Sequence, residues 1–217
     1  EEMELQSAGR LAEDVNRFGH LTTGFLGTPD LLHILTRYGY LDEAYRLMYR
    51  KEYPSWLYPV TQGATTIWER WDGQKPDGTF QNPKMNSFNH YAYGAVGDWL
   101  YSTVAGIDMA DEVPGFKQIV IKPHPGSKMN DVNASHESPY GKISSSWIIS
   151  DGEFILNIEI PVNTEAEIYV PSTGMNLREN GKDWSGATKV EFAGGNYHFL
   201  KIETGSGKYT FTSSFQP

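Results

Sequence analysis

The chain has 217 residues, a formal net charge of −9 and no cysteine. The negative charge makes a nucleic acid or an anionic membrane an unfavourable partner, and the lack of cysteine excludes disulfides, thiolate nucleophiles and zinc–thiolate sites. The length suits one large domain or two small ones, and no apolar run is long enough to cross a bilayer.

The first half of the chain has the apolar spacing of α-helices. Gly19 and Gly39 end two of the runs, and Asp42 and Glu43 stand in the first turn of a third, where the helix dipole favours carboxylates. Short connections between the runs favour antiparallel neighbours. The pattern predicts five helical ranges, at about 3–18, 30–38, 41–50, 62–72 and 86–105.

After about Val113 the pattern changes to that of strands. β-Branched and aromatic residues alternate at period two, separated by Gly, Pro, Asn and Ser, without an intervening helix. We therefore predict an all-helical part over 1–113 and an antiparallel β-sandwich over 114–217. The strands are expected within 118–125, 141–150, 153–161, 165–172, 189–202 and 208–213.

Two stretches have the composition of a ligand site. PSWLYPVTQGATTIWERWDG (54–73) surrounds Glu69 with aromatic residues, including Trp71. Aromatic faces stack on the C–H faces of sugars, whereas carboxylates and amides bind hydroxyl groups. The alternative interpretation is that Glu69 is a surface charge and the tryptophans belong to the core.

The second stretch, MNSFNHYAYGAVGDWLY (85–101), brings Asn86, Asn89 and His90 to the start of a predicted helix. Asn86 or Ser87 can also cap that helix, and a structural role is the alternative for His90. The six histidines show no paired spacing typical of metal ligands, so no metal site and no cofactor are predicted. Turn formation explains DGQKPDG (72–78), with a calcium loop as the alternative.

Five segments, in this order, resemble the C-terminal part of bacterial α-L-rhamnosidases of glycoside hydrolase family 78. The resemblance covers most of residues 20–125 and is most specific where TTIWERWD and NHYAYG occur together. The segments are TGFLGTPDLL (23–32), GYLDEAYRLM (39–48), YPSWLYPVTQGATTIWERWDG (53–73), MNSFNHYAYGAVGDWLY (85–101) and GFKQIVIKPHP (115–125).

The resemblance implies the end of an (α/α)6-barrel catalytic domain, with about five helices, followed by a C-terminal antiparallel β-domain. It implies hydrolysis with inversion of terminal α-L-rhamnosyl groups, without a cofactor. Glu69 matches the family's general base and His90 a substrate-binding histidine, and Trp71 and Asn89 are further candidate contacts. The family's general acid belongs to an earlier segment, so this chain alone is expected to be inactive.

Two alternatives remain open at this point. The barrel can act on a different sugar, or the chain can be a non-catalytic carbohydrate-binding or structural module that uses sandwich aromatics such as Trp147, Trp184 and Tyr197. An incomplete barrel also leaves apolar helix faces uncovered, which favours self-association.

Overall fold

A computed structural model describes residues 2–84, 86–126 and 128–216. The chain divides into two units, residues 1–97 and 98–217. Each unit has its own core. The predicted boundary at 113/114 falls after the first strand of the second unit.

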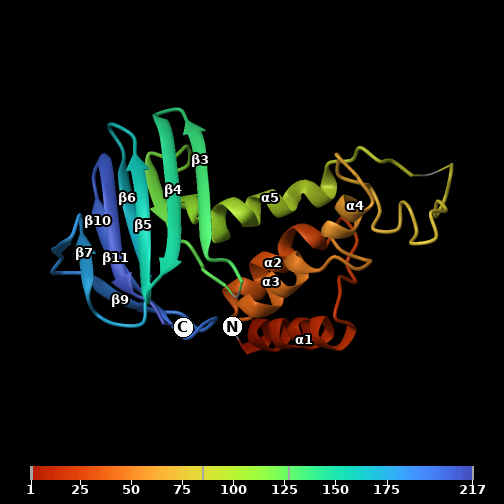
Figure 1. Cartoon of the computed structure of the whole chain (residues 1–217), viewed down its shortest axis with the longest axis horizontal. Helices are drawn as coiled ribbons and strands as arrows, with labels where there is room; N and C mark the ends of the chain where they lie inside the picture. Colours follow the sequence, from red (N-terminus) through yellow and green to blue (C-terminus); the bar gives the residue numbers. More distant parts are fainter. Residues whose placement is uncertain (1, 85, 127, 217) are drawn as a thin grey trace. The chain divides into compact units, whose positions relative to one another are not determined.

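The first unit begins with three helices that lie beside one another (Figure 1): α1 (Glu2–Phe18), α2 (Thr28–Arg37) and α3 (Leu41–Tyr49). These confirm the first three predicted helices to within two residues at each end. Pro29 lies in the first turn of α2, where its missing N–H costs nothing. The buried residues that join the helices are Ala8, Ala12, Val15, Leu31, Leu32, Leu35, Leu41, Ala44, Tyr45 and Leu47.

The remaining helices differ from the prediction. α4 (Leu57–Thr61) precedes the predicted range 62–72, which is irregular. Residues 86–91 are not helical either, and the helical run begins at η1 (Ala92–Ala95), a 3₁₀ turn. It continues as α5 (Val96–Trp99) and ends as a π-helical turn, η2 (Leu100–Ala105).

The second unit contains two sheets. One has the strand order β1-β2-β6-β10-β9 and the other β3-β4-β5-β11-β7-β8. The first comprises β1 (Ile107–Met109), β2 (Gln118–Ile121), β6 (Glu165–Ser172), β10 (His198–Thr204) and β9 (Thr188–Glu191). The second comprises β3 (Asp131–Ser138), β4 (Gly141–Ser150), β5 (Glu153–Ile160), β11 (Gly207–Ser214), β7 (Leu177–Glu179) and β8 (Lys182–Asp183).

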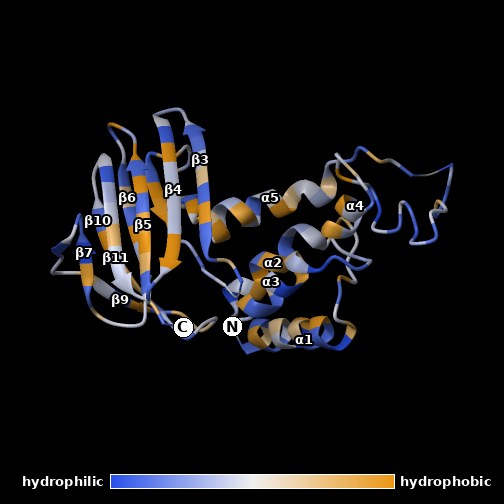
Figure 2. Cartoon of the chain, in the orientation of Figure 1, coloured by the Kyte–Doolittle hydropathy of each residue, from blue (hydrophilic) through white to orange (hydrophobic). Residues whose placement is uncertain are grey.

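The sandwich core forms where alternate residues of the two sheets turn inward. Phe199 of β10 and Phe211 of β11 are fully buried, and β5 alternates buried positions with positions that are half-buried or exposed. Figure 2 shows this alternation as hydrophobic and hydrophilic segments along the strands. All six predicted strand segments contain a strand.

One strand pair departs from the predicted antiparallel arrangement. β2 and β6 are parallel, with Gln118 opposite Glu165 and Ile121 opposite Ile168. The cause is topological: β3, β4 and β5, which separate them in sequence, belong to the other sheet. The other pairs among the described strands are antiparallel.

The end of η2 is bonded tightly to the sandwich. The Ser145 hydroxyl donates to the Ala105 carbonyl over 2.6 Å, and the Trp147 indole N–H donates to the Val104 carbonyl over 2.9 Å. Gly106 follows with φ +76°, and a Cβ built there would lie 2.2 Å from the backbone nitrogen of Pro123. Only glycine fits this close crossing of two backbone segments.

Candidate active site

The two motifs singled out from the sequence lie side by side in the first unit. The Glu69 N–H donates to the Ser87 carbonyl over 2.9 Å, and the His90 N–H donates to the Ile67 carbonyl over 2.8 Å. These bonds run between two irregular segments, so backbone pairing rather than a helix fixes both candidate residues. Glu69 and His90 are thereby held on neighbouring segments.

Trp68 forms the buried support of this pair of segments. Its side chain is 6% exposed and makes edge-to-face contacts with Tyr58 and Phe88, at centroid distances of 6.4 and 5.0 Å. The core interpretation of the tryptophans is therefore correct for Trp68, and also for Trp56, which is 7% exposed.

Trp71 is different, because it lines an open hollow. Its ring stacks on Tyr93 with centroids 3.7 Å apart and planes at 10°, and Trp56 meets it edge-on at 5.4 Å. Its indole N–H donates to the Thr23 carbonyl over 2.8 Å. Both the ring plane and the ring edge of Trp71 are thus fixed before any ligand binds, which lowers the entropic cost of binding.

Glu69 lines the same hollow as Trp71. The hollow has a volume of about 630 Å³, within the usual range for small-molecule sites. We name it the Glu69 hollow. Its lining combines the Glu69 carboxylate, the Arg70–Asp72 ion pair and an apolar loop at 24–26. The other lining residues are aromatic: Tyr53, Trp71 and Tyr93.

Two polar features lie beside Glu69 in the hollow, an ion pair and a phenol. Arg70 Nε lies 3.2 Å from Asp72 Oδ1 in an ion pair. Burial, reinforced by the Asp72 carboxylate, raises the pKa of Tyr53 above its ordinary 10.0. The Tyr53 phenol is therefore protonated at neutral pH and can donate a hydrogen bond into the hollow.

His90 and Asn89 line a second hollow, together with Thr66, Ile67, Tyr91 and Gly94. The Ala92 N–H donates to His90 Nδ1 over 3.3 Å. Because Nδ1 accepts this bond, the neutral imidazole carries its proton on Nε2, which is then a donor for a ligand hydroxyl. The Tyr91 ring stacks on the imidazole at 5.0 Å, and the Phe25 ring lies 6.2 Å away on another segment.

Phe25 connects the two hollows, since it lines the first and contacts the histidine of the second. Sequence reasoning did not select Phe25, Tyr53 or Tyr93. Each lies within a segment quoted for the family resemblance, so the signal was present, but it gave no reason to separate these residues from their neighbours.

Asn86 and the 72–78 loop have structural roles. The predicted helix cap at Asn86 is wrong, because no helix begins there; its side-chain N–H₂ donates instead to the Gly73 carbonyl over 2.7 Å. Asp77 accepts bonds from the N–H and hydroxyl of Thr79, over 2.9 and 2.6 Å, which lower its pKa. Both bonds close the turn that the sequence predicts.

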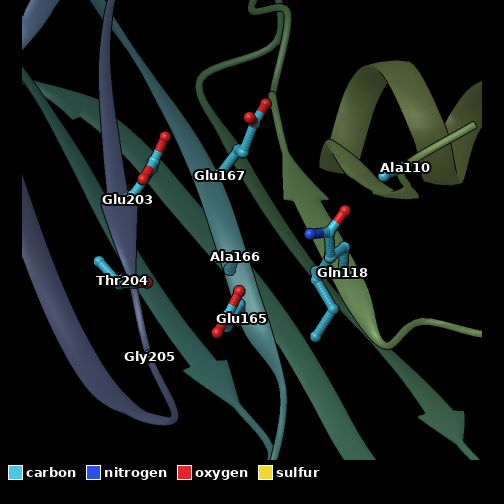
Figure 3. Close-up of a pocket in the computed structure, with 9 residues that line it drawn as sticks. Ala110, Gln118, Glu165, Ala166, Glu167, Glu203, Thr204 and Gly205 are labelled. Carbon is cyan, nitrogen blue, oxygen red and sulfur yellow. The ribbon is translucent and has the colours of Figure 1, made fainter. Parts of the chain in front are cut away.

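A third hollow lies on the five-stranded sheet of the second unit (Figure 3). Glu165 and Glu167 of β6 and Glu203 of β10 supply its carboxylates, and no aromatic ring lines it. Glu167 is paired with Lys201 at 2.7 Å, and this bond lowers the carboxyl pKa. Without an aromatic platform, this surface lacks the apolar half of a sugar site.

The sandwich aromatics considered as lectin contacts are mainly core residues. Trp147 is 1% and Tyr197 6% exposed, and Trp184 is half-buried with its ring edge-on to Phe211. Within the described residues, no group of three or more His, Cys, Asp or Glu side chains could hold a metal ion. No helix in the described part of the chain is both long and apolar enough to span a membrane.

Both parts of the chain are similar to known protein domains. Residues 1–104 match the bacterial alpha-L-rhamnosidase six-hairpin glycosidase domain, and residues 106–184 match the bacterial alpha-L-rhamnosidase C-terminal domain. An α-L-rhamnosidase of Streptomyces avermitilis is 45% identical over 193 residues, which are 89% of this chain and 18% of that protein. One from Formosa agariphila is 39% identical over 90% of this chain and 21% of its own length.

Solved structures of α-L-rhamnosidases are also similar to this chain. The crystal structure of the S. avermitilis α-L-rhamnosidase complexed with L-rhamnose has a TM-score of 0.86 at 42% identity, covering 96% of this chain and 19% of that one. The native α-L-rhamnosidase of Aspergillus terreus has a TM-score of 0.79 at 33% identity, covering 96% and 21%. The chain thus spans about a fifth of the length of these relatives, and it belongs to the bacterial α-L-rhamnosidase family, with part of the six-hairpin glycosidase domain followed by the C-terminal domain.

Proposed function

We propose that this chain supplies the general base and part of the sugar site of an inverting α-L-rhamnosidase. The observation that carries the proposal is the placement of Glu69 and the fixed Trp71–Tyr93 stack in one hollow. His90 on the adjoining segment offers an Nε2–H donor for a sugar hydroxyl. In this proposal the helical part of the chain belongs to the catalytic barrel, and the strands from β1 onward belong to the β-domain.

The chemistry needs two carboxyl groups. One acid gives its proton to the glycosidic oxygen as the C1–O bond breaks, while Glu69 takes a proton from the water whose oxygen bonds to C1 from the opposite face. The two groups stand roughly 6.5–9.5 Å apart in inverting enzymes to leave room for that water. The acid is expected in polypeptide upstream of residue 1, so the fragment alone should not turn over substrate.

The test uses 4-nitrophenyl α-L-rhamnoside with the complete gene product and with this chain alone. We expect release of nitrophenol only from the complete product, with β-L-rhamnose as the first anomer seen by NMR. Glu69→Gln should lower kcat by at least about 100-fold, the usual contribution of a general base. Glu52→Gln, at an exposed carboxylate outside the hollows, is the matched control.

A chemical rescue separates a lost base from a damaged fold. Glu69→Ala removes the base and leaves space, and azide attacks C1 without needing deprotonation. Azide should therefore restore turnover of the Ala variant and yield β-L-rhamnosyl azide. Full activity of Glu69→Gln would disprove the base assignment, and activity of the short chain alone would place the acid within these 217 residues. Turnover of another glycoside in place of the rhamnoside would favour the different-sugar alternative.

We also propose that this chain, when isolated, self-associates through α1. Met3, Leu5 and Phe18 are 79, 53 and 47% exposed, although they share the helix with buried Ala8 and Ala12. Sedimentation velocity should show a weight-average mass that rises with concentration, and Leu5→Glu should reduce it. A monomer at every concentration would contradict this proposal and leave the catalytic one untouched.

A further inference from the structure

The loop at residues 23–28 is held rigidly beside the Glu69 hollow. The Thr28 hydroxyl donates to the Gly24 carbonyl over 2.8 Å, and the Thr28 N–H donates to the same carbonyl over 3.0 Å. The hydroxyls of Thr23 and Thr28 are hydrogen-bonded at 2.8 Å, and the Trp71 indole holds the Thr23 carbonyl. The loop is thus bonded both to the start of α2 and to the aromatic stack.

This rigid loop presents two apolar side chains to the hollow. Phe25 is 49% and Leu26 87% exposed, and both line the hollow that contains Glu69. Exposed large apolar groups at adjoining positions on an ordered loop contribute little to the core. They are suited to covering an apolar part of a ligand.

Part of the hollow suits hydroxyl groups rather than hydrocarbon. Glu69 and the Arg70–Asp72 ion pair are charged, and Tyr53 offers a phenol. The faces of Trp71 and Tyr93 that meet in their stack are covered by each other. A methyl group placed against the charged side chains would displace water from them without replacing its hydrogen bonds, which is unfavourable.

A 6-deoxyhexose has one such methyl group, attached to C5. We propose that Phe25, with Leu26, receives this methyl group and is a specificity-determining residue for 6-deoxy sugars. The inference rests on the proposed function and adds the part of the site that distinguishes rhamnose from its analogues. Because Phe25 also lies beside His90, the same ring places the sugar between the Glu69 hollow and the histidine.

Three substrates that differ only in the group on C5 show the effect of the methyl group on kcat/KM. The 4-nitrophenyl α-L-rhamnoside carries CH₃ on C5, the α-L-lyxoside carries hydrogen, and the α-L-mannoside carries CH₂OH. One methyl or methylene group in an apolar pocket changes kcat/KM by about 10- to 200-fold. The complete gene product should therefore favour the rhamnoside over the lyxoside by at least about tenfold.

Phe25→Ala should lower kcat/KM for the rhamnoside by about the same factor and leave that for the lyxoside nearly unchanged, so that the preference falls to a few-fold or less. Phe25→Leu, which keeps an apolar contact, should restore most of the preference. Phe80→Ala is the matched control, because Phe80 is also 49% exposed and lines neither hollow. Its rhamnoside-to-lyxoside ratio should equal that of the wild type.

The outcomes separate the two proposals. An equal loss on all three substrates in Phe25→Ala, or an unchanged ratio, overturns the methyl-contact proposal while the proposed function stands, provided that Glu69→Gln is inactive on the rhamnoside. A wild-type enzyme that hydrolyses no rhamnoside overturns both.

Discussion

The indole of Trp71 and the phenol ring of Tyr93 lie face to face, 3.7 Å apart and nearly parallel, although 22 positions separate them in the chain. The contact joins the motif that contains Glu69 to the motif that contains His90. It therefore aligns the two halves of the candidate site through an aromatic stack as well as through backbone bonds.

We expect a double-mutant cycle of Trp71→Leu and Tyr93→Leu to give a coupling free energy of about 1 kcal/mol, the usual value for an aromatic pair beyond its buried area. Urea unfolding followed by near-UV circular dichroism measures it. A cycle of Trp71→Leu with Phe80→Leu is the control and should be additive, because the ring that Phe80 contacts among the described residues is Phe88 and not Trp71. Additivity in the first cycle would mean that the stack does not stabilise the site.

The second prediction concerns Gly106, where two backbone segments cross closely. Gly106→Ala must accommodate both a positive φ and a Cβ 2.2 Å from the Pro123 backbone, so it should lower the unfolding free energy by at least about 3 kcal/mol. Gly181→Ala is the matched control, since Gly181 has φ +80° but nothing within 4 Å of the added Cβ. It should cost only about 1 kcal/mol. Equal costs at the two positions would show that the close approach is not a constraint.

The third prediction concerns three consecutive serines of strand β4, of which only the middle one, Ser145, is buried. Ser145→Ala removes the hydroxyl that donates to the carbonyl of the buried Ala105, at a cost of about 2 kcal/mol. Ser144 and Ser146 point to the other face of the sheet and are only half-buried. Their alanine variants should change thermal stability by less than about 0.5 kcal/mol. Similar losses in all three variants would contradict a specific role for Ser145.

The pH dependence of stability should carry a contribution from His124. Burial, with a further effect of the Lys122 charge, lowers the pKa of His124 from 6.5 to about 3. The folded state therefore resists protonation while the unfolded state accepts it, so stability is lost as pH falls from about 6.5 towards 3. The expected slope from this group is about 1.4 kcal/mol per pH unit.

Urea unfolding between pH 4 and pH 8, compared between wild type and His124→Phe, isolates that slope. A phenyl ring suits the position, because the imidazole meets Phe192 and Phe199 edge-on at 4.8 and 5.0 Å. Parallel curves for wild type and His124→Phe would contradict the prediction.

The parts of the fold that follow from periodicity were predictable. α1, α2 and α3 have regular apolar stripes, α1 and α2 are followed by Gly19 and Gly39, and the long strands β4, β5 and β6 alternate clearly. Strand β3 was missed because it has no buried position, so DVNASHES carries no apolar alternation. Its pairing with β4, not its own composition, makes it a strand.

The sequence suggests some residues of the candidate site, but it does not predict how they are arranged. Trp68 and Trp71 are spaced like one face of a helix, yet Trp68 is buried against Tyr58 and Phe88 while Trp71 stacks on Tyr93. Long-range ring packing overrode the local pattern, and a single sequence does not contain that information. The identity of Phe25 as a neighbour of both Glu69 and His90 depends on the same tertiary contacts.

The strand order has a consequence for synthesis of the chain. β10 lies between β6 and β9 in one sheet, and β11 lies between β5 and β7 in the other. An inner position of each sheet is therefore filled only when residues 198–214, near the C-terminal end of the second unit, are in place. A polypeptide stalled or cleaved before residue 198 exposes unpaired edges on β6 and β5 at once, and such edges recruit other chains. The two sheets are thus completed together by residues 198–214, and a copy that lacks these residues is expected to aggregate or to be proteolysed.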